Sequence, residues 1–197
     1  KLEGLRVLTR VDFNVPLDDE LQITDNTRIK GALRTIQHII KNGGKAILMS
    51  HLGRPGGCRS DSMSLKPIAE ELSLFLRKDV KLAPDCVGQE VERLVRGMEN
   101  GDVVLLENLR FHKEEIENNT EFCKELAKLG DIYINDSFGT VHRAHASTSG
   151  VVEFITNSAI GYLIRDELRF LGDAVSKPEK PFLAIIGGAK VYDKIKV

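Results

Sequence analysis

The stretch "KAILMSHLGRPGG" (residues 45–57) decides the fold class, because it joins an apolar run to a loop of polar residues and glycines. A short apolar run bounded by turn residues is typical of a strand buried on both faces of a parallel sheet. Five other runs have this character, at residues 6–12, 79–83, 102–107, 131–136 and 181–188. Helical patterns separate them, so the sequence predicts a doubly wound α/β fold, with a parallel sheet as the middle of three α/β/α layers.

Apolar residues between these runs recur at helical spacing. Ile29, Leu33, Ile36 and Ile40 share one face, with Asp25 as a candidate cap and glycines 43–44 as a stop. Three further helices are predicted from the sets Ile68, Leu72 and Phe75, then Val91, Leu94, Val95 and Met98, then Phe122, Leu126 and Leu129. Ser64 is the candidate cap of the first of these three, and the last is expected to end at Gly130.

The pattern changes at Gly161. A helix follows in which the apolar residues are expected to face inward, namely Leu163, Ile164, Leu168, Leu171 and Val175. The segment "SKPEKP" then breaks the chain before the last apolar run. We therefore predict an α/β domain over residues 1–160, a connecting helix and hinge over 161–180, and over 181–197 the first strand of a second α/β domain that continues past Val197.

Composition excludes several classes of protein. The 28 basic and 29 acidic residues leave a net charge of −1, so no overall field would hold the chain on nucleic acid or on a membrane surface. No apolar run approaches the length of a membrane span, and the first residues lack the apolar core of a signal peptide. Three cysteines without metal-ligand spacing indicate a reducing compartment and no metal held by the protein itself.

Polar residues leave the carboxyl ends of the predicted strands, where open parallel sheets bind ligands. They are Asp12 and Asn14 after the first strand, His51 and Arg54 after the second, Arg110 after the fourth, and Thr140, His142 and Arg143 after the fifth. Glycines 53, 56, 57 and 139 allow close backbone approach. Several cationic or potentially cationic groups at one edge predict a phosphate between them, because guanidinium groups pair bidentately with phosphate oxygens.

Each of these residues also has an ordinary structural interpretation. Arg54 alone would be a solvated surface residue, Asp12 or Asn14 would shape a turn, and His142 and His145 would be hydrogen-bonded histidines near the core. The charged runs "HKEEIENN" (112–119) and "RKDVK" (77–81) are interpreted as solvated faces and helix ends. Neither a GxxxxGK[ST] phosphate loop nor a GxGxxG fingerprint is present, which disfavours P-loop nucleotidases and Rossmann-type oxidoreductases.

Six motifs together resemble the N-terminal half of the phosphoglycerate kinase family. They are "RVDFNVP" (10–16), "DNTRI" (25–29), "SHLGRP" (50–55), "LLENLRF" (105–111), "NDSFGTVHRAHAS" (135–147) and "FLAIIGGAK" (182–190). The resemblance implies two Rossmann-like domains joined by a helix and hinge. Residues 1–160 would bind 3-phosphoglycerate, and 181–197 would begin the nucleotide-binding domain.

The resemblance also implies the site residues. Arg28 and Lys190 would be catalytic. The substrate would contact Asp12, Phe13, Asn14, Arg28, His51, Leu52, Gly53, Arg54, Arg110, Thr140 and Arg143. The nucleotide would contact Gly187, Gly188, Lys190 and Lys194. No metal ligand is expected in this chain, since Mg²⁺ would arrive with ATP or ADP and be held by the second domain.

The implied reaction transfers a phosphoryl group between 1,3-bisphosphoglycerate and ADP, giving 3-phosphoglycerate and ATP. The expected partners are these small molecules only, with a monomeric full-length protein in the cytoplasm, or in a plastid. Tyr192 and Lys196 depart from the family pattern, and the later nucleotide-binding loops are absent, so the chain alone is expected to bind 3-phosphoglycerate without turnover. The alternative hypothesis is a non-catalytic α/β module that binds a phosphorylated anion.

Overall fold

A computed structural model describes residues 1–176, 180–181 and 183, and the chain divides into two compact units, residues 1–165 and 166–197. The strand predicted over 181–188 lies outside the described residues except for Pro181 and Leu183. The domain boundaries expected from the sequence therefore stay a prediction.

The described strands all belong to the first unit and form one sheet with the order β3-β4-β2-β1-β5-β6. Their bounds are β1 (Arg6–Val11), β2 (Lys45–Met49), β3 (Val80–Leu82), β4 (Val103–Leu105), β5 (Ile132–Asp136) and β6 (Ser158–Ile160). The helices are α1 (Thr27–Lys41), α2 (Lys66–Leu76), α3 (Gln89–Arg96), α4 (Thr120–Ala127) and α5 (Tyr162–Ser176). Every strand pair is parallel, which confirms the predicted fold class.

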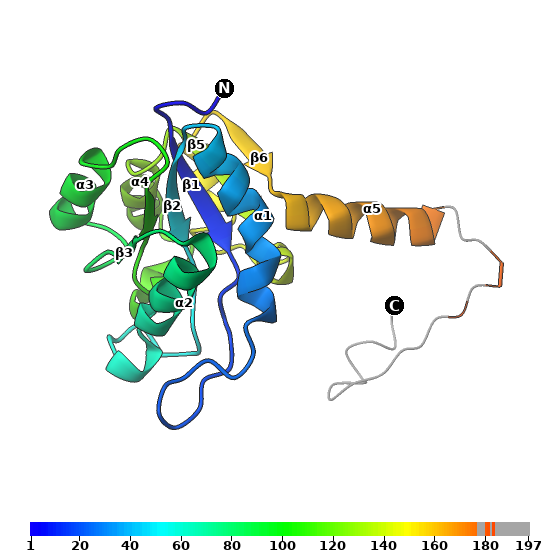
Figure 1. The fold of residues 1–197 in the computed structure, drawn as a ribbon, viewed down its shortest axis with the longest axis horizontal. Helices are drawn as coiled ribbons and strands as arrows, with labels where there is room; N and C mark the ends of the chain where they lie inside the picture. Colours follow the sequence, from blue (N-terminus) through cyan, green and yellow to red (C-terminus); the bar gives the residue numbers. More distant parts are fainter. Residues whose placement is uncertain (177–179, 182, 184–197) are drawn as a thin grey trace. The chain divides into compact units, whose positions relative to one another are not determined.

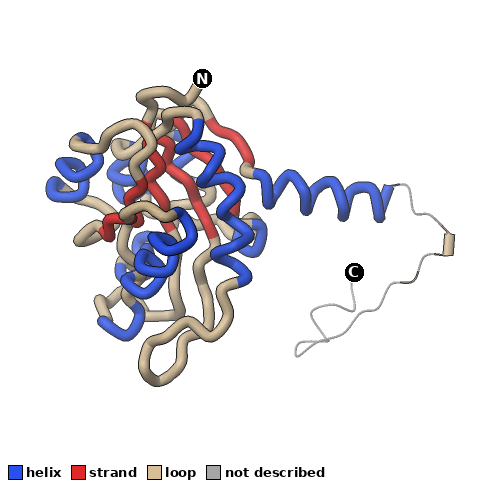
Figure 2. Tube along the Cα trace, viewed as in Figure 1, coloured by secondary structure: helices blue, strands red, loops and turns tan. Residues whose placement is uncertain are grey.

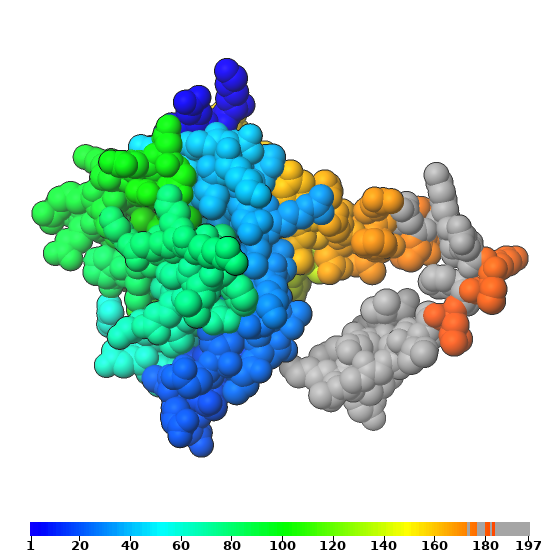
Figure 3. Space-filling view, viewed as in Figure 1, coloured from blue at the N-terminus to red at the C-terminus, as the bar shows by residue number. Residues whose placement is uncertain are grey.

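The sheet is covered by helices on both faces (Figures 1 and 2). Apolar residues of α1 and α2, such as Ile36 and Leu72, form one core with the strands. Those of α3 and α4, such as Val91 and Leu126, form a second core on the other face. The space-filling view shows the face of the first unit that carries α1 and α2, coloured from blue to green by residue number (Figure 3). Burial on both faces explains why β2 and β4 are almost continuous apolar runs.

The helix ends follow the predicted local chemistry. The Asp25 carboxylate accepts a hydrogen bond from the Thr27 backbone N–H at 2.8 Å, and Gly43 turns the chain after α1 at a positive φ of 74°. Ser64 Oγ accepts from the Lys66 backbone N–H at 3.2 Å. Both side chains stand one residue before the N-cap, at Asn26 and Leu65 respectively, so each predicted cap is displaced by one position.

In the later part of the chain, one strand was missed by the sequence analysis and one prediction is wrong. The edge strand β6 was not expected, because three exposed residues carry no detectable pattern. In α5, Ile164 is buried, but Leu168, Leu171 and Val175 are exposed rather than inward-facing. Periodicity identified the apolar side of the helix, but the side of a helix that is covered depends on tertiary contacts.

Candidate anion-binding site

The loops after β1 and β2 are fastened to each other at the carboxyl edge of the sheet. Phe13 is buried, and its backbone N–H donates to Ser50 Oγ at 2.9 Å. Asn14 Oδ1 accepts from the Gly53 backbone N–H at 2.8 Å. The predicted residues of "VDFNVP" and "SHLGRP" therefore form one surface. Within this surface, the side-chain amide of Asn14 is hydrogen-bonded to the backbone of the loop after β2.

The loop after β4 is tied to the same surface. Asn108 accepts from the Leu52 backbone N–H at 3.1 Å and donates back to the Leu52 carbonyl at 2.8 Å. The Arg110 guanidinium donates through Nη1 to the Gly53 carbonyl at 2.7 Å. Gly53 adopts a positive φ of 61°, which a side chain would make costly, so the turn that presents this carbonyl favours glycine.

Three arginines surround a hollow of about 330 Å³ at this edge, which we call the basic hollow. Its lining consists of Arg54, Gly56, Arg110, Ile116, Arg143 and His145. No carboxylate belongs to this lining, although acidic residues are as frequent as basic ones in the chain. The arginines after β2, β4 and β5 that the sequence predicted to converge therefore do so.

Arg110 is the residue at this site whose guanidinium most clearly has a nitrogen without a hydrogen-bond partner in the described part of the chain. The residue is only 8% exposed, and its Nε is buried without a hydrogen-bond partner in the described structure. Burial lowers the pKa of Arg110, and the nearby guanidinium groups of Arg143 and Arg10 lower it further. A buried donor among repelling cations is stabilised by an anion, because the anion supplies both an acceptor and a compensating charge.

The charge state of His51 differs from the one that the sequence suggested. The sequence suggested a potentially cationic group, but burial and the charges of Arg10 and Arg110 lower the pKa of His51 to about 2. Its Nδ1 lies 3.1 Å from Arg10 Nη2. Burial and neighbouring guanidinium charges also lower the pKa of His145, to about 4. Both rings are neutral near pH 7, so His51 can serve as a hydrogen-bond donor but not as a cation.

The loop after β5 completes the edge. Thr140 is buried, and its hydroxyl donates to the Ser137 carbonyl at 3.1 Å. The Arg143 backbone N–H donates to the Thr140 carbonyl at 3.0 Å, so Thr140 supports the turn that carries Arg143. A Cβ on Gly139 would lie 3.1 Å from Asp12 Oδ2, so this loop passes close to the Asp12 carboxylate.

Arg28 does not line the basic hollow; it pairs with Asp12. The guanidinium lies in the first turn of α1, is about half exposed, and donates from Nη1 to Asp12 Oδ2. The structure thus brings Asp12 and Arg28 together, and separately gathers Arg54, Arg110 and Arg143. Gly187, Gly188, Lys190 and Lys194 lie outside the described residues.

Three residues beneath the edge were missed by sequence reasoning. Arg10 is fully buried in β1, and Ser147 and Glu115 are buried beside it. Glu115 contradicts the interpretation of "HKEEIENN" as a solvated face, because its carboxylate turns inward to accept hydrogen bonds from Ser147. The detectable signal was Arg10, since a charge inside an apolar strand requires a buried partner.

One group among the described residues offers three ligand types for a metal, Asp85, Cys86 and His112. Asp85 Oδ1 and His112 Nε2 are 2.7 Å apart and already hydrogen-bonded to each other, and Cys86 is buried. We interpret the group as an Asp–His pair that ties two loops together. The cysteines 58, 86 and 123 are all free, and no helix in the described part of the chain has the length and apolarity of a membrane span.

The fold and the basic hollow define a doubly wound α/β protein with a cationic site at the carboxyl edge of its sheet. The model of the phosphoglycerate kinase family matches residues 1–197. The phosphoglycerate kinase of Chloroherpeton thalassium is 56% identical over 194 residues, which cover 98% of this chain and 49% of that protein. The chain belongs to the phosphoglycerate kinase family.

Two solved structures of the family have the same fold. That from Coxiella burnetii is 41% identical with a TM-score of 0.86, over 98% of this chain and 48% of its own. That from Pyrococcus horikoshii is 32% identical with a TM-score of 0.89, over 99% of this chain and 49% of its own. The chain spans about half the length of the curated relatives that it matches.

Proposed function

We propose that this chain forms the 3-phosphoglycerate-binding half of a phosphoglycerate kinase. The whole protein would transfer a phosphoryl group from 1,3-bisphosphoglycerate to ADP, giving 3-phosphoglycerate and ATP, and would run in reverse. The observation that carries the proposal is the buried, unpartnered Nε of Arg110 beside a hollow lined by three arginines and no carboxylate. Such a site suits the phosphate end of a small anionic substrate.

Each substrate-side residue has a proposed role. Arg54, Arg110 and Arg143 would hold the phosphate, with neutral His51 donating a further hydrogen bond. Asp12 and Asn14 would contact the hydroxyl and carboxylate region. Phe13, Leu52, Gly53 and Thr140 act through the fixed loops on which these side chains stand.

The chemistry of the reaction requires cations rather than a general base. The accepting carboxylate of 3-phosphoglycerate is ionised at neutral pH, so no proton has to be removed from it. Arg28 stands at the positive N-terminal end of α1 and is proposed to stabilise the charge that develops on the transferring phosphoryl group. This role requires the Asp12–Arg28 pair to open, which releases Asp12 for the substrate hydroxyl.

On the nucleotide side of the reaction, the residues proposed to contact ADP or ATP are Gly187, Gly188, Lys190 and Lys194. Lys190 would lie near the transferred phosphoryl group. Mg²⁺ would accompany ADP or ATP. The basic hollow does not fit a divalent cation, because guanidinium groups repel Mg²⁺ and its lining lacks the oxygen ligands of a carboxylate. We further propose a monomeric whole protein that acts on these small molecules in the cytoplasm, with a plastid as the alternative.

Titration calorimetry of the chain with 3-phosphoglycerate at fixed salt tests the proposal. Arg110→Ala is expected to lower the affinity by about ten- to hundredfold, because a buried charge-assisted hydrogen bond is lost. The matched control is Arg96→Ala, which removes an exposed arginine in α3 that pairs with Glu92. Unchanged affinity in Arg110→Ala, or equal losses in both variants, would contradict the assignment. Binding of inorganic phosphate as tightly as 3-phosphoglycerate would favour the non-catalytic anion-binding module.

A further inference from the structure

A continuous set of buried hydrogen bonds lies beneath the basic hollow and ends at His51. Arg10 is 1% exposed, and its Nη2 lies 3.1 Å from His51 Nδ1. At its other side, Arg10 Nε donates to Ser147 Oγ at 2.8 Å. The third nitrogen, Nη1, donates to the Val11 carbonyl. The guanidinium is thus held from several directions.

The contact with Arg10 decides which nitrogen of His51 carries the proton. A guanidinium has donors only, so His51 Nδ1 must be the acceptor in this contact. The proton of the neutral imidazole therefore stands on Nε2, which is left to donate. Protonation of Nδ1 would set two donors against each other, next to the further positive charges of Arg110 and Arg143.

The hydrogen bonds from Arg10 to Ser147 and from Ser147 to Glu115 explain why the Arg10 guanidinium is held in this orientation. Ser147 Oγ accepts from Arg10, so its single proton is directed to Glu115 Oε1, at 2.6 Å. The Ser147 backbone N–H donates to Glu115 Oε2 at 2.9 Å. Glu115 has no exposed surface, and its Oε1 also lies 3.7 Å from His145 Nδ1. The carboxylate therefore supplies the negative charge that a buried guanidinium needs.

We propose that Glu115 and Ser147 are positioning residues that hold Arg10 and thereby fix His51 as a neutral donor at Nε2 for the phosphorylated substrate. The inference rests on the proposed function, because it assigns a task to the His51 donor at that same site. Neither residue lines the basic hollow, and His51 is not part of that lining either. Glu115 and Ser147 reach the His51 ring through Arg10, which contacts both Ser147 and His51.

The experiment combines two measurements on the chain. Nitrogen-15 NMR of the imidazole reports the tautomer of His51 without substrate, and calorimetry reports the affinity for 3-phosphoglycerate. Ser147→Ala removes the bridge with little change in volume, and Glu115→Gln removes the charge. Ser147→Thr keeps the hydroxyl and tests rescue. Glu117→Gln makes the same change at an exposed glutamate two residues away and is the matched control.

We expect a single Nε2–H tautomer in the unchanged chain, in Ser147→Thr and in Glu117→Gln. Ser147→Ala should give a mixture of tautomers and about tenfold weaker binding, as expected for losing one oriented hydrogen bond to a charged group. A pure Nε2–H tautomer in both Ser147→Ala and Glu115→Gln would overturn the inference, even if affinity fell, because the residues would then be merely structural. An Nδ1–H tautomer in the unchanged chain would overturn it as well.

The two proposals fail in different ways. If the unchanged chain has the Nε2–H tautomer and loses it in Ser147→Ala, but does not bind 3-phosphoglycerate, the hydrogen-bond arrangement stands and the proposed substrate is wrong. If the chain binds 3-phosphoglycerate and both variants match it in tautomer and affinity, the substrate stands and the positioning role is wrong.

Discussion

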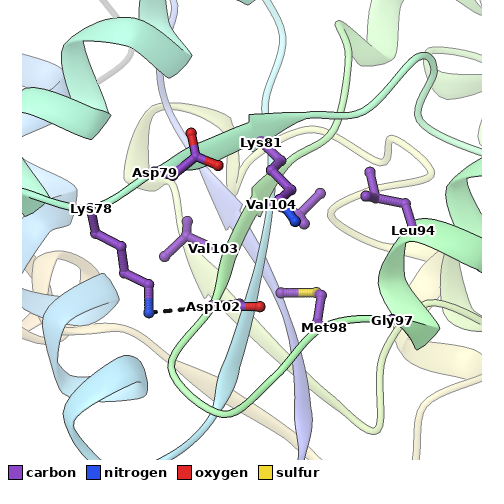
Figure 4. A pocket seen from close by; sticks show the side chains of 9 residues that line it. All are labelled: Lys78, Asp79, Lys81, Leu94, Gly97, Met98, Asp102, Val103 and Val104. Atoms are coloured by element: carbon purple, nitrogen blue, oxygen red, sulfur yellow. Dashed lines mark ion pairs between the residues drawn. The ribbon is translucent and has the colours of Figure 1, made fainter.

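The two edges of the same sheet differ in whether carboxylates lie beside their cationic side chains. At the carboxyl edge, Arg54, Arg110 and Arg143 share a hollow whose lining has no carboxylate. At the amino edge, a pocket of about 210 Å³ is lined by residues in and just before β3 and β4, and its lining includes two carboxylates, Asp79 and Asp102, as well as two lysines (Figure 4). Lys78 Nζ lies 3.5 Å from Asp102 Oδ1 in this pocket.

The same balance recurs further along the amino edge. Arg6 at the start of β1 pairs with Asp131 before β5, with Nη2 to Oδ1 at 2.6 Å and Nε to Oδ2 at 3.2 Å. Arg6 and Lys78 at the amino edge are thus each paired with a carboxylate of the chain, and both pairs are partly exposed. The comparison teaches that a hollow alone does not mark a ligand site. Positive charge that is buried without a neutralising partner, as at Arg110, does mark one, because water cannot solvate that charge.

The same substitution is expected to have very different effects on stability at the two edges. Arg10→Met is expected to lower the free energy of unfolding by about 3–5 kcal/mol, because it leaves the Glu115 carboxylate buried without its cation. Arg6→Met should cost about 1 kcal/mol or less, since the Arg6–Asp131 pair is partly exposed. Urea unfolding of both variants measures the difference. Similar losses of free energy of unfolding in the two variants would show that Arg10 stabilises Glu115 no more than Arg6 stabilises the partly exposed Asp131.

We also expect substitutions of cationic residues at the two edges to differ in their effect on the turnover rate. In the whole protein, Arg28→Ala is expected to lower kcat by about 100- to 1000-fold while KM for 3-phosphoglycerate changes little, since its interaction grows in the transition state. Lys78→Ala, which removes a cation from the amino-edge pocket, is the control and should leave both constants unchanged. A rise in KM alone for Arg28→Ala would make Arg28 a binding residue.

A smaller effect is expected from the Asp85–His112 pair, which lies in the loops after β3 and β4. The hydrogen bond that His112 Nε2–H donates to the Asp85 carboxylate raises the pKa of His112. Its contribution to stability is therefore fully present below the unfolded-state pKa of about 6.5 and is lost as pH rises through the higher folded-state value. The pair is partly exposed, so we expect less than about 1 kcal/mol.

Unfolding measured from pH 5.5 to 8.5 tests this prediction. The advantage of the unchanged chain over His112→Gln should shrink as pH rises through this range. His38→Gln is the control, because His38 is an exposed residue of α1 that contacts the Tyr162 hydroxyl rather than a carboxylate. An advantage over His112→Gln that stays constant with pH would show that the pair contributes nothing through its charge.

Much of the site was predictable because it follows from strand order. Once "RVLTRVD" and "KAILMS" are taken as neighbouring parallel strands, the residues after them must share one edge, and Arg54, Arg110 and Arg143 meet there. The pairing of Arg28 with Asp12 was not predicted, since nothing in the spacing of 16 residues joins them. The charge of His51 was misjudged because the state of an imidazole depends on neighbours that sequence position does not reveal.

The α/β class, the parallel sheet and the edge at which the arginines gather follow from the sequence alone, because apolar periodicity and strand ends are local properties of the chain. The inward turn of Glu115, the bridge from Ser147 to Arg10 and the neutral state of His51 depend on the folded structure. Those contacts join residues 32, 41 and 137 positions apart. Burial and charge pairing at such separations arise when the chain packs, since desolvation and Coulomb interactions depend on distance in space and not along the sequence.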